Sequence, residues 1–103
     1  MIIRIVKMTF KEDKLGEFQR IFARSKEKIR DFAGCMYVEF CQDVNNKNVF
    51  FTYSHWASED ALNAYRNSTF FMHTWSETKA LFADKPVAHS MERLYSSEQE
   101  RDV

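Results

Sequence analysis

The stretch HWASEDALNAYRNSTFFMHTW, residues 55–75, decides the fold of this chain. It holds two tryptophans, two histidines, two phenylalanines and a tyrosine, and it contains no glycine or proline. Ser58 and Ser68 are each typical of the residue that caps the N-terminus of a helix, because a serine hydroxyl can accept a hydrogen bond from a free backbone N–H. The sequence therefore predicts two short helices, over residues 58–66 and 68–82, whose aromatic side chains can be buried on one face.

The segments outside this stretch alternate between strand-like and helix-like patterns. The helix-like pattern covers residues 11–32, KEDKLGEFQRIFARSKEKIRDF, where apolar side chains recur at steps of three and four. It predicts an amphipathic helix of about 18–20 residues. Gly34 follows at the position where a helix C-terminal cap favours glycine, and Pro86 interrupts the later helix. β-Branched and aromatic residues are frequent in the other segments, and the predicted strands cover residues 2–10, 35–43, 48–56 and 87–96.

These elements follow the order β-α-β-β-α-β, with the second helix split in two. Two β-α-β halves of this kind make a ferredoxin-like α+β fold, in which a four-stranded antiparallel sheet carries its helices on one face. The 103 residues fit one domain of ordinary size. We expect that domain to span residues 1–96 and to be followed by a polar C-terminal tail, residues 97–103, that frays.

Both faces of the predicted sheet carry large apolar side chains. If the hairpin closes with Asn45 and Asn46 as a two-residue loop, Asp43 lies opposite Asn48. Helices can cover only one face, and a contiguous exposed apolar surface marks an interaction site. We therefore expect a homodimer that packs through the open sheet face. On this register one face combines Met36, Val38 and Phe40 with Val49, Phe51, Tyr53 and His55, and the other combines Cys35, Tyr37, Glu39 and Cys41 with Phe50, Thr52, Ser54 and Trp56.

The charge balance and the N-terminal segment argue against several classes of protein. Lys plus Arg and Asp plus Glu each number 15, so the formal net charge is zero and no basic field attracts a nucleic acid. The first ten residues, MIIRIVKMTF, are interrupted by Arg4 and Lys7 and are too short for a membrane span or a secretory segment. We expect a cytoplasmic protein that binds neither nucleic acid nor membrane.

Cysteine and glycine usage narrows the chemistry further. Cys35 and Cys41 on one strand would lie about 20 Å apart, which is beyond the reach of a disulfide bond. We therefore expect both cysteines to be reduced. Gly16 and Gly34 are the only glycines in the chain, which excludes a glycine-rich phosphate-binding loop.

The three histidines do not form a recognisable metal site, because no pair has the close spacing of zinc ligands. His55 and His89 lie on predicted strands and are the candidate catalytic bases, since an imidazole titrates near neutral pH. A structural role is the alternative for each of them. His73 lies opposite the buried stripe of its helix, so we expect it to face solvent with Glu77 as its partner.

The aromatic residues near the end of the third strand are candidates for the wall of a substrate cavity. Trp56 ends that strand and can line a cavity, fill the core or lie in an interface. Tyr65 can donate a hydrogen bond to a substrate oxygen or to another polar partner. Arg4 can meet an anionic substrate or a carboxylate of a facing sheet. The predicted ligand is a small hydrophobic or aromatic molecule, and the candidate binding residues are Trp56, Tyr65, Phe70, Phe71 and Trp75.

From Ile2 to about Tyr95 the chain resembles the antibiotic biosynthesis monooxygenase (ABM) family of the dimeric α+β barrel superfamily. The resemblance is most specific in HWASEDALNAYRNSTFF, residues 55–71. This segment has a strand ending in Trp, a Ser-capped helix with Leu and an aromatic residue, and a second helix opened by Ser near Phe. The resemblance implies a cofactor-independent monooxygenase that acts on a small aromatic or quinol-like substrate. A non-enzymatic ligand-binding or stress-related dimer of the same fold is the alternative.

One branch of this family binds haem and cleaves it. That branch uses an Asn on the first strand, a Trp in the first short helix and a His ligand in the second. The matching positions in this chain are Val6, Tyr65 and Trp75, and none carries the required group. The comparison with this branch therefore argues against haem, and we expect no metal and no other cofactor.

Overall fold

The computed structural model describes residues 1–100 of the chain. Within these residues the predicted order of strands and helices is confirmed, including the split second helix. The last strand is shorter than predicted, and part of the predicted tail forms a short helix. The elements are β1 (Ile2–Thr9), η1 (Glu12–Lys14), α1 (Leu15–Arg30), β2 (Cys35–Gln42), β3 (Val49–Trp56), α2 (Glu59–Arg66), α3 (Thr69–Lys79), β4 (Val87–Glu92) and α4 (Ser97–Glu100).

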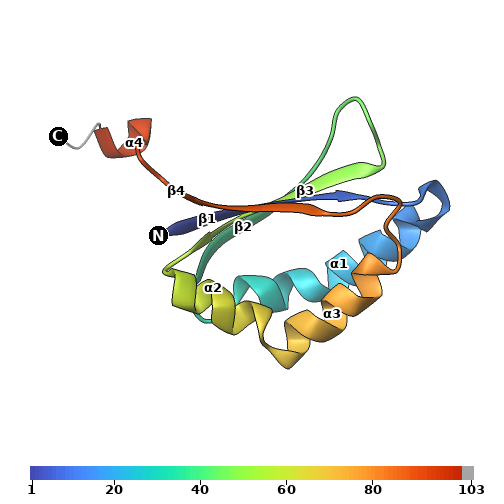
Figure 1. Ribbon diagram of the computed structural model, residues 1–103, viewed down its shortest axis with the longest axis horizontal. Coiled ribbons are helices and arrows are strands. Elements are labelled where there is room, and N and C mark those ends of the chain that lie inside the picture. Colours follow the sequence, from blue (N-terminus) through green and yellow to red (C-terminus); the bar gives the residue numbers. More distant parts are fainter. Residues whose placement is uncertain (101–103) are drawn as a thin grey trace.

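The four strands form one antiparallel sheet in the order β2-β3-β1-β4. Helices α1, α2 and α3 lie on one face of this sheet, and no helix of residues 1–100 lies on the other face (Figure 1). Helix α4 lies beyond the end of the sheet (Figure 1). The ferredoxin-like α+β architecture is therefore confirmed. The boundary between domain and tail stays a prediction, and residues 101–103 of that tail lie outside the described residues.

Two serine caps separate the short helices as the sequence predicts. The Ser58 hydroxyl accepts a hydrogen bond from the Ala61 N–H at 3.1 Å, at the start of α2. The Ser68 hydroxyl accepts one from the Phe71 N–H at 3.1 Å and donates one to the Tyr65 carbonyl at 2.6 Å. Ser68 therefore ends one helix and starts the next, which fixes the angle at which α3 leaves α2.

From Tyr37 to Asp43 the register of the β2–β3 hairpin differs by one residue from the predicted register, and an irregularity between Cys35 and Tyr37 restores the predicted pairing of Cys35 with Trp56. The Asp43 N–H bonds the Val49 carbonyl at 2.9 Å, so Asp43 lies opposite Val49 and the predicted pairing with Asn48 is wrong. The loop is longer than two residues because the Asp43 carboxylate accepts hydrogen bonds from the Asn45 and Asn46 N–H groups. A slip of one residue exchanges the faces of a strand. Val38 and Phe40 therefore share the helix-covered face with Phe50, Thr52 and Ser54.

The core lies between the helix-covered face and α1, and it is built largely from rings. Phe10 is fully buried, and its ring stacks on that of Phe18 with centroids 3.9 Å apart. A single β-bridge joins Phe10 to Phe82, which ties the end of β1 to the segment after α3. The buried cluster comprises Met8, Phe10, Phe18, Ile21, Phe50 and Leu81.

Gly34 is the glycine that the fold requires. Its φ is +88°, and a β-carbon there would lie 2.5 Å from the Ala61 side chain. We expect Gly34→Ala to lower the free energy of unfolding by about 2–4 kcal/mol, from left-handed strain and from the clash with α2. Gly16→Ala is the matched control, since its nearest neighbour would lie 3.6 Å away, and we expect it to stabilise α1 by up to about 1 kcal/mol.

Urea unfolding of the two variants and of Gly34→Ala/Ala61→Gly checks this prediction. The double variant should recover the part of the loss that comes from the clash and keep the part that comes from the backbone. Equal stability of Gly16→Ala and Gly34→Ala would show that the α1–β2 turn does not need glycine.

The cysteines and the helix lengths bear on two further expectations from the sequence. Cys35 and Cys41 both lie on β2 and form no disulfide bond, as expected. Within residues 1–100, no helix combines the length and the apolar character that crossing a bilayer requires.

Candidate functional site

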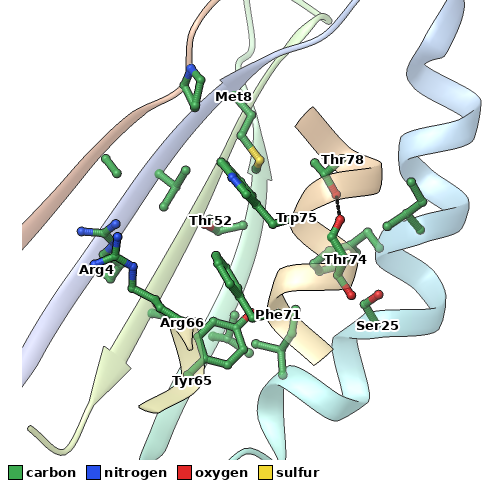
Figure 2. Close-up of a pocket in the computed structure, with 18 of the residues that line it drawn as sticks. Arg4, Met8, Ser25, Thr52, Tyr65, Arg66, Phe71, Thr74, Trp75 and Thr78 are labelled. Atoms are coloured by element: carbon green, nitrogen blue, oxygen red, sulfur yellow. Dashed lines mark hydrogen bonds between the residues drawn. The ribbon is translucent and has the colours of Figure 1, made fainter. Parts of the chain in front are cut away.

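A cavity of about 330 Å³ lies between the helix-covered face of the sheet and helices α1, α2 and α3 (Figure 2). All four strands and these three helices contribute to its lining. Pockets that bind small molecules commonly enclose about 300–1,000 Å³. The cavity is therefore at the small end of the range for a ligand site, and most of its lining is apolar.

A continuous row of aromatic rings forms one wall of the cavity. Trp56 is 1% exposed, and its ring stacks on that of Tyr65 with centroids 4.8 Å apart. The Tyr65 ring meets Phe71 edge-on at 5.0 Å, and Phe71 stacks with Trp75 at 5.8 Å. The structure thus brings four of the five predicted binding residues together around one space.

The local sequence explains which rings reach the cavity. Phe71 and Trp75 are four residues apart on α3, so their side chains lie on the same face of that helix. Phe70 is rotated away from that face and does not line the cavity. Its ring instead lies 5.7 Å from the Lys28 ammonium group on α1. The structure therefore leaves Phe70 outside the set that the sequence analysis grouped with it.

Hydroxyl groups interrupt the apolar lining. The Trp56 indole N–H donates to the Ser54 hydroxyl at 3.0 Å, which fixes the indole against β3. Thr52 and Tyr65 also line the cavity, and neither side chain makes a hydrogen bond within the described part of the chain. Burial raises the pKa of the Tyr65 phenol well above its usual range. Tyr65 is therefore a protonated hydrogen-bond donor at neutral pH and cannot act there as a base.

Two arginines lie together at one end of the cavity (Figure 2). The Arg4 guanidinium on β1 donates a hydrogen bond to the Ser90 hydroxyl on β4 at 2.9 Å. Arg66 comes from the last turn of α2. Burial lowers the pKa of Arg4, and the charge of Arg66 lowers it further. The sequence pattern indicates a ligand role for Arg4 but not for Arg66, whose only signal in the sequence is its place directly after Tyr65.

The two candidate catalytic histidines lie on the other face of the sheet. His55 pairs with Ile3 of β1, and His89 pairs with Ile5 of the same strand. Arg4, which lies between Ile3 and Ile5, has its side chain on the opposite face and lines the cavity. Since successive side chains of a strand point to opposite faces, neither histidine enters the cavity. A catalytic role for either one stays a prediction, and it would require a substrate on the face that carries no helix.

His55 belongs to a polar cluster on that face. Its Nε2 lies 2.9 Å from the Tyr53 hydroxyl. Burial lowers the pKa of His55, and the charge of Arg93 lowers it further, whereas Glu39 acts in the opposite direction. The imidazole is therefore neutral at neutral pH and is engaged with a neighbouring side chain on its own strand.

Neither His73 nor the haem-matching positions supply a ligand to the cavity. The predicted surface pair is confirmed, because the His73 Nε2 lies 3.4 Å from a Glu77 carboxylate oxygen and the His73 side chain is 74% exposed. Val6, Tyr65 and Trp75 do line the cavity, but the described lining includes no histidine or cysteine. These residues do not fit a haem held in the manner of that branch. Among the described residues, no group of three or more His, Cys, Asp or Glu side chains is placed to hold a metal ion.

Comparison with known proteins identifies the family and the fold. Residues 1–75 match the sequence model of the family described as antibiotic biosynthesis monooxygenase. No curated protein matches the chain. A solved structure described as an antibiotic biosynthesis monooxygenase superposes with a TM-score of 0.87 at 16% identity, and the alignment covers 92% of this chain and 100% of the other.

Two further structures of proteins described in the same way give similar results. One, from Nitrosomonas europaea, has a TM-score of 0.85 at 18% identity and covers 92% of this chain and 100% of its own. The other, from Caulobacter crescentus, has a TM-score of 0.85 at 19% identity, with 91% and 90% covered. At these identities the structural likeness shows the fold alone. Because the family match covers well over half of the chain, the protein belongs to the antibiotic biosynthesis monooxygenase (ABM) family.

Proposed function

We propose that this protein is a homodimeric, cofactor-independent monooxygenase that oxidises a small aromatic or quinol-like molecule. The observation that carries the proposal is the cavity walled by Trp56, Tyr65, Phe71 and Trp75. An engineered cavity of about 150 Å³ takes up benzene, so a cavity of about 330 Å³ has room for a larger ring system. Flat aromatic walls favour a planar ligand, because stacked rings add to the free energy of burial.

The proposed chemistry needs no group beyond the substrate and O₂. The substrate loses a proton, its electron-rich anion transfers electrons to O₂, and a carbon–oxygen bond forms. Conversion of a ring C–H of the phenol to a quinone carbonyl removes two hydrogens and four electrons. One atom of O₂ becomes the new carbonyl oxygen, and the other leaves as one molecule of water. The Tyr65 hydroxyl can donate a hydrogen bond to the substrate oxygen on which the negative charge is located.

The homodimer is proposed from the face of the sheet that the helices leave uncovered, here called the open face. Tyr37, Val87 and Met91 on it are each 39–47% exposed although they are large and apolar. A second copy of the same face would bury these groups in a symmetric interface. The open face carries Ile3, Ile5, Tyr37, Phe51, Tyr53, His55, Val87, His89 and Met91, and Lys7, Glu39 and Cys41 lie among them.

One observation favours a non-enzymatic alternative. Among the described residues that line the cavity there is no histidine, aspartate or glutamate. Without a general base, the same cavity can bind a small aromatic ligand and leave it unchanged. A ligand-binding or stress-related dimer is therefore the second candidate function.

Oxygen uptake with a panel of quinols and acidic phenols tests the proposal. We expect consumption of O₂ with at least one substrate, and we expect Thr74→Phe to reduce the rate at least about ten-fold because its ring would enter the cavity from α3. Met72→Phe is the matched control, since Met72 lies on the same helix and is 61% exposed. It should keep the rate of the unmodified protein.

The outcomes separate the two candidate functions. Turnover that is lost in Thr74→Phe and kept in Met72→Phe supports a monooxygenase that works in this cavity. Absence of O₂ uptake with every substrate, in a protein that still binds an aromatic ligand, would leave the binding function. If turnover is unchanged in Thr74→Phe, the reaction does not take place in this cavity. His55 and His89 on the other face of the sheet would then be the candidates to test.

A further inference from the structure

Within residues 1–100, no carboxylate forms an ion pair with the two arginines at the end of the cavity. Arg4 and Arg66 come from different elements, and their guanidinium groups converge on the same end of the cavity (Figure 2). Neither takes part in any of the ion pairs among the described residues. Glu92, two residues beyond Ser90 on β4, forms no ion pair with either of them. Two cations that face each other without a carboxylate repel, and this arrangement suits a site that receives an anion.

The protein holds Arg4 in place for such a role. Its guanidinium donates to the Ser90 hydroxyl at 2.9 Å, a neutral partner that orients the group and leaves its charge uncompensated. Arg4 lies on the helix-covered side of β1, so it does not face a partner sheet across the open face. Of the two roles that the sequence left open for Arg4, the structure favours contact with an anionic ligand.

We propose that Arg4 and Arg66 form an anion subsite, so that the ligand of this cavity is a planar aromatic molecule with an anionic oxygen group, carboxylate or phenolate, at one end. The inference rests on the proposed function only in taking the same cavity as the ligand site. The guanidinium fork matches the geometry of a carboxylate and also accepts a single anionic oxygen. The rings of Trp56 and Tyr65 then lie along the apolar body of the ligand.

The subsite also explains how a cavity can hold a deprotonated substrate although its described lining includes no histidine, aspartate or glutamate. A cation close to an acidic group favours its charged form and lowers its pKa. Two arginines therefore favour the anion of a phenol once it is bound, and the proton can pass to solvent beside Arg66, which is exposed. The same pair selects against neutral aromatics of equal size, because a neutral group leaves both charges unpaired.

Binding of naphthoate and of its neutral analogue naphthamide, both followed by titration without O₂, tests the inference. We expect the protein to bind naphthoate at least about ten-fold more tightly than naphthamide. Arg4→Gln and Arg66→Gln should each remove most of this preference while leaving the affinity for naphthamide within about two-fold. Arg20→Gln is the matched control, because it removes the same charge from an exposed position that does not line the cavity.

A third probe distinguishes phenolate from carboxylate recognition. The anion of para-nitrophenol absorbs at a longer wavelength than the neutral form, so the spectrum of the bound probe reports its protonation state. We expect the pKa of the bound phenol to fall in the unmodified protein and to return toward its solution value in Arg66→Gln. A fall in the pKa supports recognition of phenolates, and naphthoate preference without it assigns the subsite to carboxylates.

The ratio of the affinities for naphthoate and naphthamide is measured on the same protein sample, so it depends neither on the folded fraction nor on turnover. Equal loss of both naphthalene probes in the arginine variants, equal affinity for the two probes in the unmodified protein, or binding of neither would each contradict the anion subsite. Because the titrations contain no O₂, a protein that never consumes oxygen still reports on the subsite. Conversely, if the titrations show no preference for the anion, oxygen uptake by the protein would still support the monooxygenase function.

Discussion

Replacement of Phe10 by alanine is expected to lower the free energy of unfolding by about 3–5 kcal/mol. Phe10 is 0% exposed, and its ring lies 3.9 Å from that of Phe18, 5.2 Å from that of Phe82 and 5.8 Å from that of Phe50. These rings come from the residue after β1, from α1, from β3 and from the segment after α3, so the cavity left by alanine cannot close without moving several elements. Since a domain of this size is stable by only about 5–15 kcal/mol, the loss should be visible as a large shift of the urea midpoint.

Two further variants serve as comparisons for the loss of stability in Phe10→Ala. Phe10→Leu keeps most of the volume and should cost about 1–1.5 kcal/mol. Met72→Ala, at a position that is 61% exposed, should change the stability by no more than about 0.5 kcal/mol. If Phe10→Ala proved no more destabilising than Met72→Ala, the ring cluster would not be the core that holds the sheet to α1.

The second large effect is expected at the open face. Ile5 lies on β1, one of the two central strands of the sheet. It pairs with Tyr53 on β3 and with His89 on β4. In the proposed symmetric dimer, Ile5→Asp would move two carboxylates, one from each copy, out of water and into a buried interface. We expect the dissociation constant of the dimer to rise at least about 100-fold, so that the variant sediments as a monomer at micromolar concentration.

The matched control for this prediction is Met72→Asp, which adds the same charge to the solvent side of α3. It should leave the dimer intact in sedimentation velocity. A monomeric mass for the unmodified protein at micromolar concentration would contradict the proposed dimer directly. If the protein remains a dimer after Ile5→Asp, the dimer interface lies on another surface. A different partner would then have to bury the apolar side chains of the open face.

The order of the elements could be predicted because each signal is local. The serine caps at Ser58 and Ser68 act within a few residues, and the structure shows both of them bonded as predicted. Helical phase is also local, which is why His73 was correctly placed toward solvent beside Glu77. The same phase relation turns Phe70 away from the cavity that Phe71 lines, so the prediction that both rings line one cavity is wrong for Phe70.

The register of the sheet could not be read from the residue pattern. Both faces of β3 carry large apolar or aromatic groups, so a shift of one residue leaves the pattern of hydrophobicity almost unchanged. The side chain of Asp43 decides the register by bonding the N–H groups of the loop, and this moves the partner of Asp43 from Asn48 to Val49. A side-chain bond that selects between two loop lengths leaves no periodic signal in the sequence.

The sequence by itself determined the order of strands and helices, the family and most of the aromatic residues that line the cavity, because caps, periodicity and ring content act over short spans. Only the tertiary structure decided which groups share the cavity. It brought Arg4 on β1 beside Arg66 on α2, and it placed His55 and His89 on the opposite side of the sheet. The physical reason is that strand pairing and helix packing join residues far apart in the chain, and their contacts depend on register and on the docking of helices against the sheet.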